Sequence, residues 1–421
     1  MKQRNLRLLG VFSFLILLIS ISLSVSSCSF SSSANIDYVA DRLSEYDIPD
    51  FDKAKFRAAE KIFHKYAAND LPDAQTLAES TVSVYLESFH GYIDTSDKSE
   101  VTDALLSCYA YSTGDRYAVY RNPEQYDDYS SNMSGNFYGI GVVITHDQTL
   151  NTVTVKEVYS DSGAEEAGIL PGDLIIGSDG NRLADAGYDK VVGALKDDSK
   201  LTVDVIILRG DTEITLTVTK KKIVEQSVKY SIDENKIGYI KISSFKSNTF
   251  EQFKEAIDFL EETGAVGIVY DLRSNPGGYL SAVVNMLSYI SPKGTTIASF
   301  SNDYANTMID RDSHSVSLPS VVICNGNTAS AGELFTAAMR DFDEEFGYFE
   351  VTIVGSTTHG KGVMQSTFSL SDGSYVTLTV AYYNPPSGVN YDGVGIVPDV
   401  VIEDDGSRLD AAYDEILKLV K

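Results

Sequence analysis

The sequence has little cysteine, and this scarcity excludes two common ways of cross-linking a fold. The chain of 421 residues contains three cysteines. These are too few for a disulfide framework, and no C-x-x-C pair predicts a structural zinc site. Cys108 and Cys324 lie in the apolar runs "ALLSCYA" and "SVVICNG", so we expect both to be buried like small hydrophobic residues. Stability must therefore come from hydrophobic cores.

Basic residues are also scarce. Lys and Arg number 34 against 60 Asp and Glu, which gives a formal net charge of −26. Nucleic-acid partners need basic surfaces and are not expected, and the charge disfavours adsorption to anionic lipid by electrostatics alone. The length is sufficient for about two or three domains with sizeable cores.

The N-terminus has the pattern of an export signal. Lys2, Arg4 and Arg7 precede an apolar run at 8–23, which is short for a membrane-spanning helix. The following "SVSSC" resembles a bacterial lipobox, in which Cys28 would become the lipidated first residue. We predict a lipoprotein signal peptide at 1–27, a polar tether at 28–35, and a bacterial, exported protein that is lipid-anchored on the extracytoplasmic face of the membrane. The alternatives are an unlipidated secreted protein and an uncleaved anchor.

Residues 36–130 carry helical signals. The stretches "DKAKFRAAEKIFHKYAA" and "DAQTLAESTVSVYLESF" place apolar residues at helical spacing. His64 and His90 lie here, apart from any ligand-like cluster, and are expected to be surface or packing residues.

Residues 131–223 have a different pattern, with short strands rich in Val, Ile and Thr around "SGAEEAGILPGDLIIGSDG". This stretch resembles a PDZ domain, which binds an extended peptide along a sheet edge and its terminal carboxylate in a nest of N–H groups. The matching carboxylate loop would consist of Tyr138, Gly139, Ile140 and Gly141. A β-bulge or turn is the alternative reading of these glycines when they are taken alone.

Residues 224–421 alternate between strands and helices, which predicts an α/β layered domain. A helix is expected over 248–264, with Asn248 as its N-cap and Gly264 as its stop. The whole chain is thus predicted to be multidomain α/β, with a helical N-terminal region, a β-rich PDZ domain and the layered domain.

The segment "VGSTTHGKGVMQ" matches a phosphate-binding loop as far as Lys361 but places Gly362 where a hydroxyl should follow. Such a loop also needs a helix after it, whereas "GVMQSTFSLSDGSYVTLTVAYY" predicts two strands. We therefore interpret Lys361 differently. A lysine whose pKa is lowered by burial can remove the proton from a serine hydroxyl, and flanking glycines allow the backbone to enclose it.

Ser330 is the best serine for this role. It opens the predicted helix in "NTASAGELFTAAMRDF", where free N–H groups and the helix dipole favour an oxyanion. Ala331 N–H would be one donor, and the turn at Gly277 and Gly278 could supply another. Local sequence taken alone favours a capping box between Ser330 and Glu333, in which the serine only caps the helix.

Other ionisable residues are weaker candidates. Asp341 lies eleven residues beyond Ser330, too far along a regular helix to contact it. Glu333 is expected to be occupied with the cap. No histidine has a convincing triad partner, although His359 is a rival base because it lies two residues before Lys361.

Taken together, these motifs resemble the carboxyl-terminal processing peptidases, or tail-specific proteases, which are serine peptidases with a Ser-Lys pair. The resemblance runs from about residue 100 to 403 and rests on five segments in order: "GDRYAVYRNPEQY", "DLRSNPGGYL", "TASAGELFTAAMRDF", "GKGVMQ" and "LTVAYYNPPSGVNYDGVGIVPDVVI". It implies Ser330 as nucleophile, Lys361 as general base and Gln365 as the residue that orients the lysine.

The resemblance implies a serine endopeptidase without metal or cofactor that recognises the free C-terminus of protein substrates. A homodimer through the N-terminal helices is one further implication. The main alternative is a tethered, catalytically silent PDZ scaffold, which would bind peptides without cleaving them. A nucleotide hydrolase is a more distant third.

Overall fold

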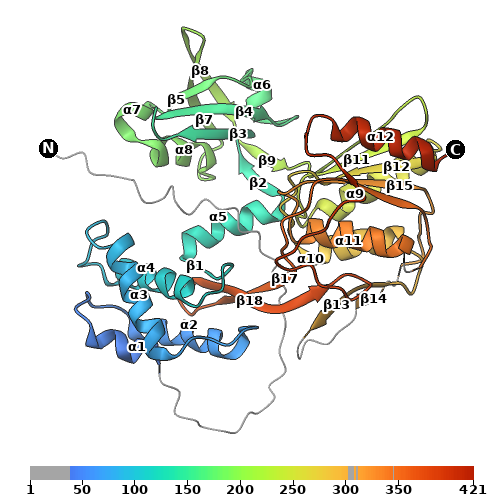
Figure 1. The fold of residues 1–421 in the computed structure, drawn as a ribbon. Helices are drawn as coiled ribbons and strands as arrows, with labels where there is room; N and C mark the ends of the chain where they lie inside the picture. Colours follow the sequence, from blue (N-terminus) through green and yellow to red (C-terminus); the bar gives the residue numbers. More distant parts are fainter. Residues whose placement is uncertain (1–37, 302–307, 310–311, 345) are drawn as a thin grey trace. The chain divides into compact units, whose positions relative to one another are not determined.

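The computed structural model describes residues 38–301, 308–309, 312–344 and 346–421 (Figure 1). The predicted signal peptide, the tether and Cys28 lie outside the described residues. The chain forms two compact units, one of residues 131–226 and the other of the segment ending at Ser130 together with residues 227–421. The second unit is therefore built from two separate stretches of the chain.

The N-terminal region is helical, as the sequence predicts. Its elements are α1 (Val39–Arg42), a 3-10 turn (Leu43–Glu45), α2 (Lys53–Tyr66), α3 (Ala74–Ser88) and α4 (Lys98–Ser112). Asp52, Asp73 and Asp97 cap α2, α3 and α4, each accepting a hydrogen bond from an N–H of the first turn. These carboxylates satisfy donors that would otherwise lack partners, which fixes where each helix begins.

This region packs with the residues beyond 227 in one compact unit. Strand β1 (Val119–Arg121) pairs antiparallel with β18 (Tyr375–Asn384), and Tyr66 of α2 stacks on Phe368 with ring centroids 4.5 Å apart. One hydrophobic core includes side chains from both stretches. Helix α5 (Pro123–Ser134) follows β1.

A six-stranded sheet organises the larger unit. Its order is β10-β11-β12-β15-β16-β19, with β10 antiparallel to β11 and the other pairs parallel. The strands are β10 (Val228–Ile232), β11 (Ile237–Ile242), β12 (Gly267–Asp271), β15 (Ser320–Cys324), β16 (Val351–Gly355) and β19 (Val400–Val401). Every residue of β12 and β15 is buried, as expected for the centre of a parallel sheet.

Helices cover both faces of this sheet (Figure 1). Alternate residues of β15 belong to different cores: Val321 and Ile323 pack with Ile416 of α12 (Arg408–Leu419), whereas Val322 and Cys324 belong to the large core. That core also contains side chains from the other helices of the layer, which are α9 (Thr249–Glu262), α10 (Leu280–Ile290) and α11 (Ala331–Glu344). The α/β layered fold is confirmed, and the prediction that Cys108 and Cys324 are buried is confirmed as well.

The predicted ends of α9 are found where the sequence placed them. Gly264 adopts a left-handed conformation with φ +74°, which ends the helix as expected. Asn248 occupies the N-cap position, but its side chain makes no capping hydrogen bond. Thr249 Oγ1 accepts the N–H of Lys246. This bond satisfies a donor that precedes the helix, so it fixes the approach of the chain to the helix and does not cap the first turn.

A second sheet follows Lys361. Strand β17 (Val363–Ser369) pairs antiparallel with β18, which also pairs with β1 and with β13 (Thr296–Ser301); β13 in turn pairs with β14 (Met308–Ile309). Lys361 therefore precedes a strand and no helix, which confirms that its glycine-rich segment is not a phosphate-binding loop.

The unit of residues 131–226 is β-rich. Its main sheet has the order β3-β4-β5-β7-β8, with β6 added to β5, and β2 pairs separately with β9. The strands are β2 (Asn136–Gly139), β3 (Val142–Asp147), β4 (Thr152–Val158), β5 (Leu174–Ser178), β6 (Asn181–Arg182), β7 (Thr202–Arg209), β8 (Thr212–Thr219) and β9 (Lys221–Val224). The helices are α6 (Gly163–Ala167), α7 (Leu183–Ala186) and α8 (Tyr188–Lys196).

None of the helices in the described part of the chain combines the length and the apolar character needed to cross a membrane.

Candidate active site

Ser330 lies between β15 and α11, with its side chain fully buried. Its φ is +56°, a left-handed conformation that non-glycine residues seldom adopt and that often marks functional sites. The Tyr383 hydroxyl approaches Ser330 Oγ at 3.4 Å. The capping-box alternative is only half realised: Glu333 Oε2 accepts the Ser330 N–H at 2.9 Å, but Ser330 Oγ faces Tyr383 instead of capping the helix.

The buried carboxylate of Glu333 joins the serine segment to the lysine segment. One oxygen, Oε2, accepts the N–H groups of both Ser330 and Lys361, at 2.9 and 2.8 Å. The other, Oε1, accepts Gly360 N–H and the Thr358 hydroxyl, each at 2.6 Å. Burial raises the pKa of Glu333, and these four donors oppose the increase. The sequence predicted the contact with Ser330 but not the bridge to Lys361.

The Lys361 side chain is held in a setting that favours its neutral form. It is 3% exposed, and burial lowers the pKa of its ammonium to about 7, while Asp115 and Glu333 counteract the decrease. The ammonium nitrogen lies 4.3 Å from the ring centroid of Tyr117. Burial also raises the pKa of Tyr117, to about 12. At neutral pH a substantial fraction of Lys361 can thus serve as a base.

The rival ionisable residues face other surroundings. The His359 side chain is exposed, unlike that of Lys361 two residues later. Asp341 Oδ2 accepts the N–H of Ser387 at 2.8 Å, in keeping with a structural role. His64 lies 3.7 Å from the buried Glu60 within α2, and His90 is exposed.

The Gly277-Gly278 turn lies against the serine segment. A Cβ on Gly277 would come within 2.8 Å of both Ser330 Cβ and Ala331 N. The Gly277 N–H donates to Asn275 Oδ1 at 2.7 Å. Within the described residues, the N–H groups of Gly278 and Ala331 donate to no acceptor. Of the two glycines considered for an oxyanion donor, Gly278 is the one whose N–H remains available.

Gly277→Ala is expected to lower the melting temperature and the peptidase activity together. The residue has φ +99°, and a new Cβ would also lie 2.7 Å from Ala329 O, so the substitution adds a clash to the strain of a left-handed residue. Gly264→Ala is the matched control, because its φ is +74° but its Cβ would meet nothing within 4 Å. Thermal unfolding of both variants should show the larger decrease for Gly277→Ala; equal decreases would mean that the turn is not packed against Ser330.

Gln365 is fully buried on β17. Its Nε2 donates to Thr379 Oγ1 at 3.2 Å and to Val363 O at 3.4 Å. Its Oε1 is buried and accepts no hydrogen bond from the described residues. An unsatisfied buried acceptor is costly, so the amide oxygen of Gln365 is a feature that calls for a function.

The predicted carboxylate loop of the smaller unit runs from β2 into β3. Ile140 is buried and its carbonyl accepts Ala164 N–H, whereas Gly141, with φ +85°, packs against Ser162. The N–H groups of Ile140 and Gly141 have no acceptor within the described residues. Tyr138 and Gly139 belong to β2 and pair with β9. Strand β3, which follows the loop, lies at the edge of its sheet.

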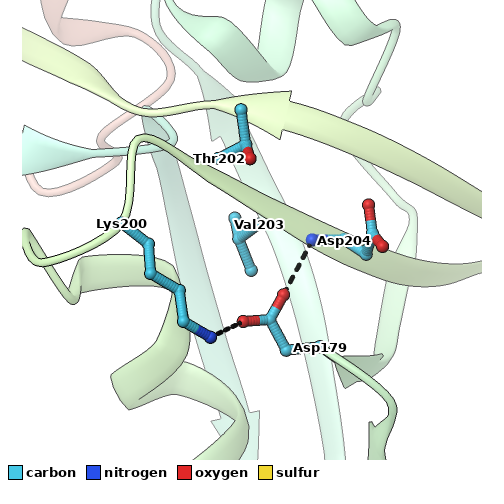
Figure 2. Close-up of a pocket in the computed structure, with 5 residues that line it drawn as sticks. All are labelled: Asp179, Lys200, Thr202, Val203 and Asp204. Carbon is cyan, nitrogen blue, oxygen red and sulfur yellow. Dashed lines mark hydrogen bonds and ion pairs between the residues drawn. The ribbon is translucent and has the colours of Figure 1, made fainter.

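A shallow pocket in the same unit lies elsewhere (Figure 2). It is lined by Asp179 after β5 and by Lys200, Thr202, Val203 and Asp204 before and within β7. Asp179 accepts both the Lys200 ammonium at 2.7 Å and Asp204 N–H at 3.0 Å. These contacts account for the charges that face the pocket, and neither the predicted carboxylate loop nor β3 lines it.

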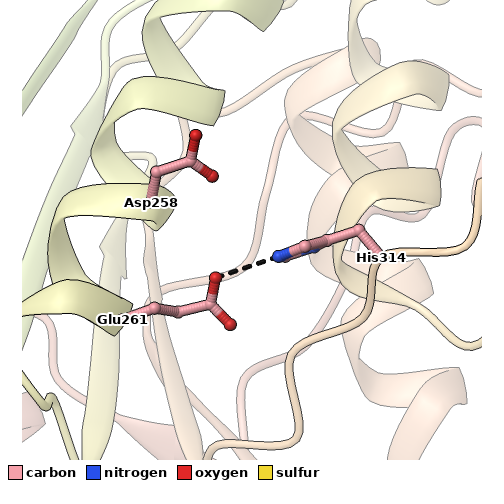
Figure 3. Close-up of side chains that lie close together, drawn as sticks. All are labelled: Asp258, Glu261 and His314. Atoms are coloured by element: carbon pink, nitrogen blue, oxygen red, sulfur yellow. Dashed lines mark hydrogen bonds and ion pairs between the residues drawn. The ribbon is translucent and has the colours of Figure 1, made fainter.

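Asp258, Glu261 and His314 form a separate cluster in the larger unit (Figure 3). Each has protein partners already: Asp258 pairs with Lys254 at 2.8 Å, and His314 contacts Glu261 Oε2 at 2.9 Å and Tyr289 O at 2.7 Å. The cluster is accounted for as a network of ion pairs and hydrogen bonds.

Several residues of the candidate site were missed by reasoning from local motifs. Tyr383, Thr379, Asp115 and Tyr117 contact the groups described above from distant parts of the chain. Asp115 and Tyr117 belong to "GDRYAVY", which the family resemblance singled out without giving it a role. Thr379 and Tyr383 belong to "LTVAYYN", which the resemblance also singled out without giving either residue a role, and the place of Thr379 in the site depends on the pairing of β18 with β17.

Comparison with known proteins identifies the class that this fold and site define. The peptidase family S41 model matches residues 236–402, and the PDZ domain model matches residues 129–208. The chain belongs to peptidase family S41, in a form that carries a PDZ domain, which confirms the family and the fold predicted from the sequence.

Particular relatives are carboxyl-terminal processing proteases. The chain is 32% identical over 288 residues to the carboxyl-terminal-processing protease of Synechocystis sp., covering 67% of this chain and 66% of that one. It is 30% identical over 315 residues to the carboxy-terminal processing protease CtpA of Bacillus subtilis, covering 74% and 66%. A solved structure of the photosystem II D1 C-terminal processing protease covers 87% of this chain and 96% of its own, with 24% identity and a TM-score of 0.49.

Proposed function

We propose that the chain is a serine endopeptidase in which Ser330 is the nucleophile and Lys361 the general base. The observation that carries the proposal is the Glu333 carboxylate, whose Oε2 accepts the backbone N–H groups of both residues. This shared acceptor holds Ser330 and Lys361, which are 31 positions apart in the sequence (361 − 330), in neighbouring segments. The second support is the lowered pKa of Lys361, because a lysine must be neutral to accept a proton.

The reaction then has two steps. Neutral Lys361 Nζ takes the proton of Ser330 Oγ as the oxygen attacks the peptide carbonyl carbon, and the tetrahedral oxyanion accepts hydrogen bonds from the Ala331 and Gly278 N–H groups. The C–N bond breaks, and the Lys361 ammonium protonates the leaving amine. Water then loses a proton to Lys361 and attacks the acyl carbon, after which Ser330 Oγ leaves and regains a proton.

The PDZ domain is proposed to recognise the substrate by its free C-terminus. The support is the pair of available N–H groups at Ile140 and Gly141 beside the edge strand β3. A terminal carboxylate can accept such donors while the peptide extends the sheet from its edge.

The test uses the chain from residue 29 and an unfolded protein substrate that ends in an apolar residue, prepared with a free or an amidated C-terminus. We expect cleavage of both, with kcat/KM lower by about 10-fold for the amidated form, since one charge-assisted contact is lost. Equal kcat/KM values would refute recognition of the carboxylate and leave the peptidase intact. Absence of cleavage with the peptide still bound would favour the silent scaffold.

The lipid anchor is a further proposal, supported by the N-terminal sequence. The basic start, the apolar run and "SVSSC" predict lipidation of Cys28. Metabolic labelling with a fatty-acid analogue should mark the full chain and not Cys28→Ala. Labelling of both, or of neither, would exclude this anchor.

A further inference from the structure

The unpaired oxygen of Gln365 leads to residues that no sequence motif assigned to the reaction. A primary amide has an oxygen that accepts and an NH2 group that donates, and the two ends are similar in shape. Which end faces the catalytic lysine therefore depends on what holds the other end. In this chain the other end faces Thr379 Oγ1 and Val363 O.

Thr379 can act as an acceptor because its own proton is engaged elsewhere. Its hydroxyl donates to Asp115 Oδ1 at 3.0 Å, and its backbone N–H donates to Asp115 Oδ2 at 2.7 Å. A hydroxyl has one proton. Once that proton points to Asp115, the oxygen can only accept from Gln365, so the NH2 group must face Thr379.

Asp115 is itself firmly placed. It lies in the turn between α4 and β1, and its Oδ1 also accepts the N–H of Tyr117 at 2.9 Å. The ring of Tyr117 lies beside the Lys361 ammonium. Among the charged neighbours that act on Lys361, Asp115 has the largest influence. The main charged neighbours are Asp115, Glu333 and Asp392, which favour the ammonium, and Arg116, which disfavours it.

We propose that Asp115 and Thr379 are positioning residues that orient the amide of Gln365 so that Oε1, and not the NH2 group, is presented to the ammonium of Lys361 formed during catalysis. This inference rests on the proposed function. The hydrogen bonds form a directed chain from the Asp115 carboxylate through the Thr379 hydroxyl to the Gln365 amide. The chain stabilises the protonated lysine that must later donate its proton to the leaving amine.

Substitutions can reverse or remove each link. Asp115→Asn has one acceptor oxygen in place of two, and its NH2 group replaces the other. If the NH2 group faces the Thr379 backbone N–H, two donors oppose each other. If it faces the Thr379 hydroxyl, the hydroxyl accepts from it and turns its own proton toward Gln365. Thr379→Val removes the hydroxyl, and Thr379→Ser keeps it. Thr377→Val is the matched control, because Thr377 is buried on the same strand and its hydroxyl contacts Thr367 and Arg121 instead of Gln365 and Asp115.

Two readouts test the proposal. We expect Thr379→Val and Asp115→Asn to lower kcat by about 10-fold with little change in KM, while Thr379→Ser and Thr377→Val stay near wild type. The second readout needs no turnover: NMR titration of chain labelled with ¹³C at the lysine ε carbons, with the Lys361 signal assigned from Lys361→Arg. Asp115→Asn should move the Lys361 midpoint down by about one pH unit, since a neighbouring negative charge is lost.

The proposal is overturned if Thr379→Val matches Thr377→Val in kcat, or if Asp115→Asn leaves the Lys361 midpoint unchanged. A wild type that does not cleave would instead refute the proposed function, and the titration would still report whether Asp115 acts on Lys361.

Discussion

Ser330→Ala is expected to lower kcat/KM for an unfolded protein substrate by at least about 10³-fold, because nothing can replace the oxygen that attacks the carbonyl. The buried Ser330 side chain has one hydrogen-bond contact, with the Tyr383 hydroxyl. Its loss should therefore change the fold little, and the melting temperature should remain close to that of wild type.

Ser369→Ala provides the control for this experiment. Ser369 is exposed at the end of β17, so its hydroxyl can be removed without affecting the site. Progress curves for the three proteins should separate Ser330→Ala from the other two. Equal rates for all three would show that another nucleophile or a contaminant cleaves the substrate.

Lys361→Met is the second large effect, and it acts on activity and stability in opposite directions. Loss of the base should lower kcat/KM by about 10²- to 10⁴-fold. The free energy of unfolding should increase, because the substitution removes the cost of burying the Lys361 amine, which must carry a proton at acidic pH. The pKa of Lys361 falls from its usual 10.5 to about 7 on folding, so the unfolded chain binds more protons between these values.

The sign of the pH dependence follows. The stability cost of burying the ammonium is fully present below about pH 7 and disappears as the pH rises toward 10.5. Lys361→Met should thus have a higher melting temperature than wild type at pH 6, with a smaller difference at pH 9. Lys418→Met, whose lysine is 62% exposed, should show neither effect.

Wild-type kcat/KM should rise with pH through about 7 as Lys361 loses its proton. A flat profile from about pH 5 to 9, with chemistry shown to be rate-limiting, would exclude a neutral lysine as the base.

The helices, the strands and the glycine-flanked lysine could be predicted because each has a local cause. Helical spacing of apolar residues marked α2 and α3, and the two strands after Lys361 excluded a phosphate loop. The capping box around Ser330 was ambiguous for a physical reason: the same Glu333 that bonds the Ser330 N–H also bonds Lys361. Local sequence shows the first contact and cannot show the second, which joins residues 28 positions apart.

The roles of the site residues that tertiary pairing brings together could not be predicted from local sequence. Thr379 faces Gln365 because β18 pairs with β17 in one register, and a bulge between Met364 and Gln365 shifts that register. Asp115 reaches Thr379 across 264 residues.

The pairing of β1 with β18 also sets the order of events during synthesis. Arg121 of β1 contacts Thr377 of β18, 256 residues later. Asp115 likewise has its hydrogen-bond partner, Thr379, on β18. A chain emerging from the ribosome can form its first helices and the whole unit of residues 131–226 before either partner exists. Ser330 precedes Lys361 in this order, and both precede β18. A nascent chain consequently contains the proposed nucleophile and base before the strand that completes their surroundings, and we expect no peptidase activity until nearly all of the chain has been made.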